Sequence, residues 1–445
     1  MSESTDYIIK ELSLVIGNRK RDIITYFQEI NIFDSVMMPC VSGNILLLDA
    51  SALSDLYGFD GDESLFISFG TKKSSTVLEK TFRIYKQTER RMASPTSETY
   101  VLHFVSDELI FSEQQKINRS YTGLSYTEIV ERILFGENSY LNVPSNRKKQ
   151  FIKSQGIHDI IIPNLTPLDA ANWCSRKAVD ESKAPTFLFY ENLDGYHFTT
   201  LKSISKSSPV GNVLFGIKNI DPNDEKREAT TASYFEVIGN FDFLKNTKDG
   251  VFASKFIGVD PLIRNIRTFQ ISYGDNFSKF SNGAKQDIPI VENRKKKRNN
   301  EMYDSRKTLY YATQNRISDE YIKTKSAGEI NKADDTHNYL TQRRSIFSAF
   351  FSTRVRVVLP GSFAIQSGRT VNLNVLRRSA VSGENIDLEL AGKYIIVATR
   401  HIFHPQKYEV VFDAVDDVSS ADFSSAITFG PGDQAVSPDP DLVDQ

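Results

Sequence analysis

The stretch Gly61–Phe69, which reads GDESLFISF, carries the clearest strand signal in the chain. Leu65, Ile67 and Phe69 occupy alternate positions, and a period of two predicts a half-buried β-strand. Short segments of the same kind, separated by residues that favour turns, lie at 44–49, 81–87 and 100–105. Four or more strands within about 80 residues predict a small antiparallel barrel or sandwich.

The order of segments around this stretch recurs near the C-terminus. Each copy has a glycine-led alternating strand, an aromatic-led strand and a Tyr-x3-Phe strand with Asp behind it. In the first copy these are Gly61–Phe69, a strand that ends at Thr88-Glu89-Arg90, and Tyr100-x3-Phe104 with Asp107. In the second copy they are Gly368–Val375, a strand that ends at Thr399-Arg400, and Tyr408-x3-Phe412 with Asp416. The pattern predicts a structural duplication, and two unrelated β segments are the alternative.

Helical signals occupy the middle of the chain. Ser125 and Glu128 fit a capping box, and Thr166-Pro167 fits an N-cap followed by proline at the first helical position. A third helix is expected near Asn240, and residues 275–332 form a polar excursion with mobile loops. We expect strands at 351–359, 370–376, 394–400 and 408–415, and a flexible acidic tail from residue 418.

These signals predict a mainly β, α+β fold in six segments. They are a first tube-like β-barrel (1–115), a mixed α/β domain (116–200), the first part of a second tube-like β-barrel (201–239), an insertion with a helix and long polar loops (240–344), the remainder of the second barrel (345–417) and the tail (418–445).

Residue counts exclude several classes of protein. The 54 Lys and Arg balance 56 Asp and Glu to a net charge of −2, which favours neither nucleic acid nor an anionic membrane as a stable partner. Cys40 and Cys174 form no disulfide framework or zinc motif. The first ten residues lack an apolar signal core, and the longest apolar run, 394–398, is too short to span a bilayer. We expect a soluble chain made in a cytosol.

Motifs for catalysis, cofactors and metals are lacking in the sequence. No Walker A loop and no G-x-G-x-x-G follows a strand. His401 and His404 have an H-x-x-H spacing, but in a strand residues three apart face opposite sides, which disfavours a shared metal. We therefore expect no catalytic residue, no cofactor and no metal site.

Two basic groups remain as candidate sites. Arg354 and Arg356 alternate with apolar residues in a strand, so they face either solvent or the wall of a pore. The second group is a basic loop within the polar excursion, which we interpret as solvated although a role in neutralising phosphates is the alternative. It consists of Arg294, Lys295, Lys296, Lys297 and Arg298.

Several phrases resemble the central baseplate hub proteins of contractile-tailed (myovirus) bacteriophages. Ile30–Ala50 resembles the opening of these proteins, with an I-x-I-(F/Y)-(E/D) phrase before a strand that ends in Asp. Leu56–Phe69 looks like the Gly-Asp-Glu strand that comes next. Ile117–Gly123 is similar to the linker that leaves the first barrel, and Ile161–Trp173 to the Pro-Asn-x-(T/S)-Pro helix start. The resemblance covers residues 30–180 well and is looser beyond.

The resemblance implies a structural virion protein and not an enzyme. A trimer of a chain with two similar barrels would present six units to the sixfold tail tube and three to the trimeric cell-puncturing spike, and it would form part of the genome-ejection channel. The implied partners are the chain itself as a homotrimer, the spike, the tail tube protein, other baseplate proteins, and genomic DNA in passing, without stable membrane insertion. The implied location is the tail baseplate of the virion, assembled in the host cytoplasm, with a part in host attachment and entry.

Two alternatives follow from the same sequence. The first is the hub of a phage-derived contractile injection device that conducts protein effectors. The second is a baseplate-associated wall hydrolase. Such an enzyme needs two carboxylates that flank a cleft, and no sequence motif identifies such a pair among the 56 acidic residues.

Overall fold

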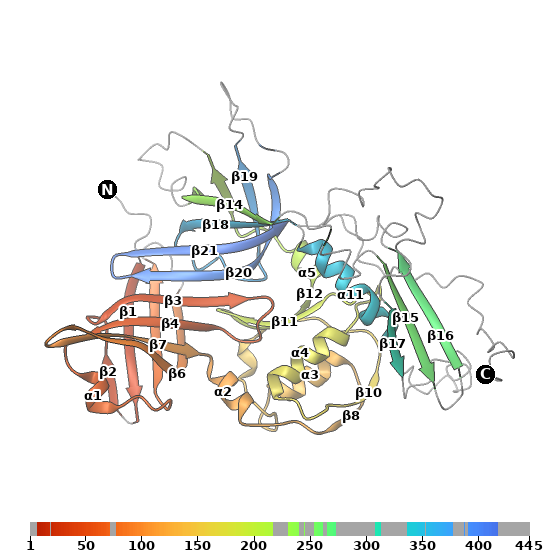
Figure 1. Cartoon of the computed structure of the whole chain (residues 1–445), viewed down its shortest axis with the longest axis horizontal. Helices are drawn as coiled ribbons and strands as arrows, with labels where there is room; N and C mark the ends of the chain where they lie inside the picture. The colour runs from red at the N-terminus through yellow and green to blue at the C-terminus, as the bar shows by residue number, and fades with distance from the viewer. Residues whose placement is uncertain are drawn as a thin grey trace.

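A sheet of 13 strands dominates the chain (Figure 1). Its path runs β14-β18-β21-β20-β3-β4-β7-β6-β5-β1-β2, with β19 on β20 and β13 on β19. The computed structural model describes residues 7–71 except 18, 77–216, 230–239, 244, 253–260, 265–272, 308–312, 336–351, 353–376, 387 and 390–416. The mainly β character predicted from the alternating segments is confirmed, while the closing of each set of strands into a barrel stays a prediction.

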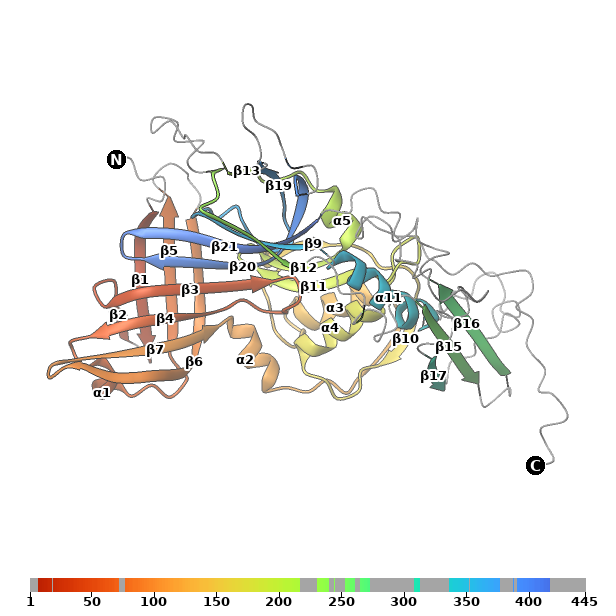
Figure 2. The same cartoon turned by 45° about the horizontal axis from the view of Figure 1, so that its top comes forward.

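The first β unit contains most of the N-terminal strands. Its elements are β1 (Tyr7–Ile16), β2 (Arg19–Asp22), β3 (Phe27–Ser35), β4 (Ser42–Asp49), α1 (Leu53–Tyr57), β5 (Ser64–Thr71), β6 (Val77–Ser94) and β7 (Ser97–Val105). Leu65, Ile67 and Phe69 are fully buried, as the alternation in β5 predicts. β1, β5 and β6 run across β3 and β4, so they cover one face of those strands (Figures 1 and 2).

The second β unit combines strands from distant parts of the sequence. Its elements are β13 (Asn212–Phe215), β14 (Tyr234–Gly239), β18 (Arg354–Pro360), β19 (Thr370–Val375), β20 (Gly392–His404) and β21 (Lys407–Asp416). Their inward residues form a separate apolar core that includes Val355, Val357, Ile396, Val410 and Phe412.

The two β units follow the same strand path. Read along the sheet, β3-β4-β7-β6-β5-β1 in the first unit corresponds to β14-β18-β21-β20-β19-β13 in the second. All these pairings are antiparallel except that of β13 with β19. The two glycines that lead the repeated segments share a positive φ, +101° at Gly61 and +78° at Gly368, which disfavours other residues there. The strand order therefore repeats as the sequence pattern predicts.

A mixed α/β segment follows the first β unit. Its elements are α2 (Asp107–Glu113), β8 (Ser120–Leu124), α3 (Tyr126–Leu134), a short 3-10 helix (Ser145–Arg147), β9 (Lys148–Phe151), β10 (His158–Ile161), α4 (Pro167–Lys177), β11 (Phe187–Asn192), β12 (Gly195–Thr200) and α5 (Leu201–Lys206). Both predicted helix starts are confirmed: Ser125 and Glu128 form a reciprocal capping box, and Thr166 accepts a hydrogen bond from the backbone N–H of Asp169.

The insertion contains elements that the sequence did not reveal. They are β15 (Ala253–Asp260), β16 (Asn265–Ser272), β17 (Thr308–Ala312) and α11 (Thr336–Phe350). β17 lies inside the stretch expected to be loops, and it pairs with β15 from some 50 residues earlier. The strand expected from Phe351 begins at Arg354 instead, because α11 extends to Phe350. The helix expected near Asn240, the basic loop 294–298 and the tail from 418 lie outside the described residues, apart from residue 244 in the first.

Arg343 connects α11 to the α/β segment. Its guanidinium donates to the carbonyl oxygens of Pro185 at 2.8 Å, Phe187 at 2.9 Å and Ser175 at 3.4 Å. Burial and the charge of Arg176 lower the pKa of Arg343 to about 9, and the three carbonyl oxygens satisfy its buried donors. This contact holds α11 against the α/β segment.

A buried ion cluster holds the α/β segment against the first β unit. Glu191 of β11 is fully buried, and its carboxylate accepts from Lys80 Nζ at 2.7 Å, Arg147 Nη2 at 2.8 Å and Ser106 Oγ at 2.7 Å. Burial alone raises the pKa of Glu191, but Lys80 and Arg147 outweigh it and lower the pKa. Burial and the Glu191 charge raise the pKa of Glu108, which also pairs with Arg147.

We expect Glu191→Gln to lower the free energy of unfolding by about 3–5 kcal/mol, because it leaves Lys80 without its buried counter-charge. Urea unfolding followed by tryptophan fluorescence and circular dichroism would measure this. The matched control is Glu131→Gln, which breaks an exposed pair with Lys148 and should cost less than about 1 kcal/mol. Equal effects of the two changes would show that the cluster adds no stability beyond a surface pair.

Candidate functional site: the seam between the two β units

The two β units meet at a seam, which is the antiparallel pairing of Ile30–Ser35 in β3 with Ala398–Phe403 in β20. Figures 1 and 2 both show β21, β20, β3 and β4 side by side in one surface. The tip of the β20–β21 hairpin adds apolar contact, since Phe403 stacks on Tyr408 at 4.3 Å and lies 4.7 Å from Phe69 between ring centroids. The seam is thus both hydrogen-bonded and packed.

On its inward face the seam buries a carboxylate, Asp34. Its Oδ1 accepts from Thr399 Oγ1 at 2.7 Å and from the backbone N–H of Ser367 at 3.0 Å. Burial raises the pKa of Asp34 to about 6, although these two hydrogen bonds and the charge of Lys80 oppose the rise. Asp34 therefore connects the first β unit to two segments of the second, at an electrostatic cost when it is ionised.

Several buried polar atoms of Asp34 and of nearby residues have no hydrogen-bond partner within the part of the chain that the structure describes. They are Asp34 Oδ2, Gln366 Oε1, Ser367 Oγ and His401 Nε2. His401 contacts Tyr408 Oη through Nδ1 at 2.8 Å, and burial lowers the pKa of His401 to about 3, so its ring is neutral. The inward face of the seam consequently carries unsatisfied polar groups inside an otherwise apolar core.

The outward face of the seam carries a polar network across both units. Arg400 Nε donates to Asn31 Oδ1 at 2.8 Å, and its Nη2 donates to Glu29 at 3.3 Å. Asn31 Nδ2 donates to Glu29 and to Asn44 Oδ1, each at 2.8 Å. His404 lies 4.0 Å from Glu29 on the same face, whereas His401 is buried on the other, as the three-residue spacing predicts.

The structure places both arginines predicted from β18 on this outward face. Arg354 and Arg356 are exposed and alternate with the buried Val355 and Val357. Arg356 makes a two-pronged ion pair with Asp413 of β21, at 2.8 and 3.1 Å. The sequence signal found the exposed face, but it did not identify Asp413 or the Arg400 network, whose partners are far apart in the chain. Whether these arginines line a channel stays a prediction.

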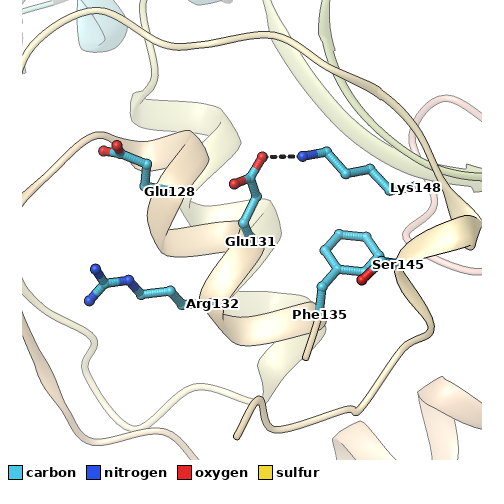
Figure 3. A pocket seen from close by; sticks show the side chains of 6 residues that line it. All are labelled: Glu128, Glu131, Arg132, Phe135, Ser145 and Lys148. Carbon is cyan, nitrogen blue, oxygen red and sulfur yellow. Dashed lines mark hydrogen bonds and ion pairs between the residues drawn. The ribbon is translucent and has the colours of Figure 1, made fainter. Parts of the chain in front are cut away.

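A shallow pocket of about 400 Å³ lies on the α/β segment (Figure 3). Glu131 of α3 and Phe135, which directly follows that helix, face Lys148 and Ser145, and Glu131 pairs with Lys148. Among the described residues, no group of three or more His, Cys, Asp or Glu side chains is placed to hold a metal ion, and no helix is long and apolar enough to cross a membrane.

We expect the pH dependence of stability to depend on Asp34. Its pKa is about 6 in the folded chain against an ordinary value of 3.8, so the folded state binds more protons in this window. Stability should therefore fall by about 2–3 kcal/mol as pH rises from 4 to 6. Asp34→Asn should flatten this slope and stabilise the chain at pH 7, because the buried charge disappears while an acceptor oxygen remains.

Urea midpoints between pH 4 and pH 8 would test this expectation, with Asp413→Asn on the outward face as the matched carboxylate-to-amide change away from the buried site. An Asp34→Asn variant that keeps the wild-type slope, or that is less stable at pH 7, would contradict it.

The chain was compared with known proteins. No protein-family model matches it, and no curated protein matches it. The tail protein of Neisseria meningitidis MC58 matches with a TM-score of 0.54 and 9% sequence identity, over 94% of this chain and 99% of that chain. The 43 kDa tail protein of prophage MuSo2 from Shewanella oneidensis matches with a TM-score of 0.52 and 10% identity, over 93% and 99%. The predicted likeness to phage tail proteins is thus confirmed at the level of the fold.

Proposed function

We propose that this chain is the central baseplate hub of a contractile tail, acting as a homotrimer that adapts the sixfold tail tube to a threefold spike and encloses part of the channel for the genome. The role is geometric and needs no catalytic residue. The observation that carries it is the seam, because the same contact repeated between copies produces a closed ring.

The internal repeat identifies the edges that would meet. By strand order β14 corresponds to β3, and β6 corresponds to β20. The contact equivalent to β3–β20 is therefore β14–β6, and these two strands lie far apart along the sheet of one chain. A β14–β6 contact between two copies is head-to-tail, and such contacts make rings when the rotation closes.

The pairing pattern of both edges supports this assignment. In β20 the first residues pair with β19 and the second half pairs with β3. In β6 the first half pairs with β5, whereas Tyr85–Ser94 pairs with β7 alone within the described residues. β14 pairs with β18 alone in that same part of the chain. An open strand edge is a template for another strand.

Exposed apolar side chains gather at both edges. Tyr85 and Met92 of β6 are 50% and 70% exposed, and Tyr234 and Val237 of β14 are 48% and 40% exposed. Covering such residues favours association. Three copies are proposed because two equivalent units per chain then give six, which matches a sixfold tube while the ring keeps threefold symmetry.

Light scattering coupled to size exclusion, with negative-stain imaging, tests the proposal. We expect wild type to elute as a trimer with a central hole. Val237→Lys and Met92→Lys should each lower the trimer affinity at least about tenfold, because a lysine ammonium is costly to bury in an apolar contact. Ile161→Lys is the matched control, since Ile161 is 67% exposed on β10, and its trimer should persist.

A wild-type monomer at micromolar concentration would refute the trimer. If wild type is a trimer and the two edge variants are as trimeric as the Ile161→Lys control, the ring forms through other surfaces.

A further inference from the structure

We propose that the outward face of the seam sheet lines the channel and cancels its own charge by ion pairing, so that duplex DNA passes through without binding. This inference rests on the proposed function, and it names the wall that the passing DNA would meet. The wall is defined as the exposed face of β4, β7, β3, β20, β21 and β18.

Packing decides which face can line a channel. The inward residues of β3 and β4, such as Ile30, Ile32 and Ile45, lie in the core under β1, β5 and β6. Those three strands therefore lie on one side of the seam sheet. In a ring built by strands pairing side to side, the side with more material needs the larger circumference, so it faces outward. The face opposite these three strands, where the end of α5 meets Thr370 of β19 and Lys393 of β20, then faces the axis.

The charges of the wall in the second β unit occur as pairs. Arg356 is held by both oxygens of Asp413, and Arg400 is bonded to Glu29 across the seam. Lys407 lies 2.7 Å from Glu409. Arg354 and Lys393 are further cations of these strands, and Lys393 donates to the carbonyl oxygen of Ser205. Glu236 of the adjoining β14 is a further carboxylate, opposite Arg356 in the strand register. Three of the cations are thus held by carboxylates.

β4 and β7 of the first β unit add a part of the wall without charge. The outward residues of β4 and β7 are polar or apolar but not charged: Ser42, Asn44, Leu46, Leu48, Ser97, Thr99, Val101 and His103. Burial and the charge of Lys86 lower the pKa of His103, which favours its neutral form. Its Nε2 hydrogen-bonds Thr88. This half of the wall offers hydrogen-bonding groups to water rather than charge to a phosphate.

A wall whose cations are paired lets DNA pass, because unpaired cations would bind the DNA. Each lysine or arginine that neutralises a phosphate releases counter-ions and adds affinity, which holds the DNA in place. A guanidinium already held by a carboxylate gains little from a phosphate. Removing the carboxylates should therefore convert an inert wall into a DNA-binding one.

The double variant Glu29→Gln/Asp413→Asn tests this on the full chain, because it frees one arginine in each of two pairs. The control Glu11→Gln/Glu131→Gln makes the same change in net charge by freeing Lys20 and Lys148, which lie outside the wall. The probes are a linear DNA duplex and a nicked circle of the same length. A linear duplex can thread a closed ring, whereas a circle cannot.

We expect the double variant to retain linear DNA at least about tenfold more than wild type, to lose it as salt rises, and not to retain the circle. The control should retain neither probe above the wild-type level. Retention of the circle as well as the linear duplex would place the freed arginines outside the ring and overturn the inference. No gain with linear DNA, or an equal gain in the control, would overturn it too.

Light scattering on the same samples separates the two proposals. If wild type forms a ring and the DNA result is negative, this inference alone fails. If wild type forms no ring, the proposed function fails, and the inference fails with it because no enclosed channel exists.

Discussion

Backbone N–H and C=O groups at the edge of a sheet must be hydrogen-bonded or left to water, and in this chain β3 and β20 satisfy each other. Their pairing over Ile30–Ser35 and Ala398–Phe403 joins the two β units through residues that lie more than 360 positions apart. It also brings Phe403 and Tyr408 into the core of the first unit. The shared sheet and its continuous outward face depend on this contact.

The seam gives its two faces opposite chemistry. Inward, Asp34 is buried beside unsatisfied polar atoms, and its pKa rises to about 6 because burial disfavours the charged carboxylate. Outward, Arg400 and Glu29 sit in water at the same pairing, and their interaction serves orientation more than stability. A strand period of two places Asp34 and Arg400 on opposite faces although their residues are neighbours across the seam.

Local patterns could predict much of the fold. Alternation found β4, β5, β7, β19 and β21, and a capping box and an N-cap followed by proline found α3 and α4, because these signals depend on residues within one turn or strand. The same reasoning missed α11, whose aromatic end resembles a strand, and β17, which is a strand because β15 offers it an edge. It placed Arg354 and Arg356 on an exposed face, but it did not identify the ion pair with Asp413.

The sequence by itself determined many of the strand and helix segments and the repeated order led by Gly61 and Gly368. Both follow from φ restrictions, caps or side-chain period, which act over a few residues. Only the tertiary structure decided that β3 pairs with β20, that Glu191 meets Lys80 and Arg147, and that the outward charges fall into pairs. Those outcomes depend on which distant strand edges and side chains come together. A contact between residues hundreds of positions apart produces no periodic pattern in the local sequence from which it could be predicted.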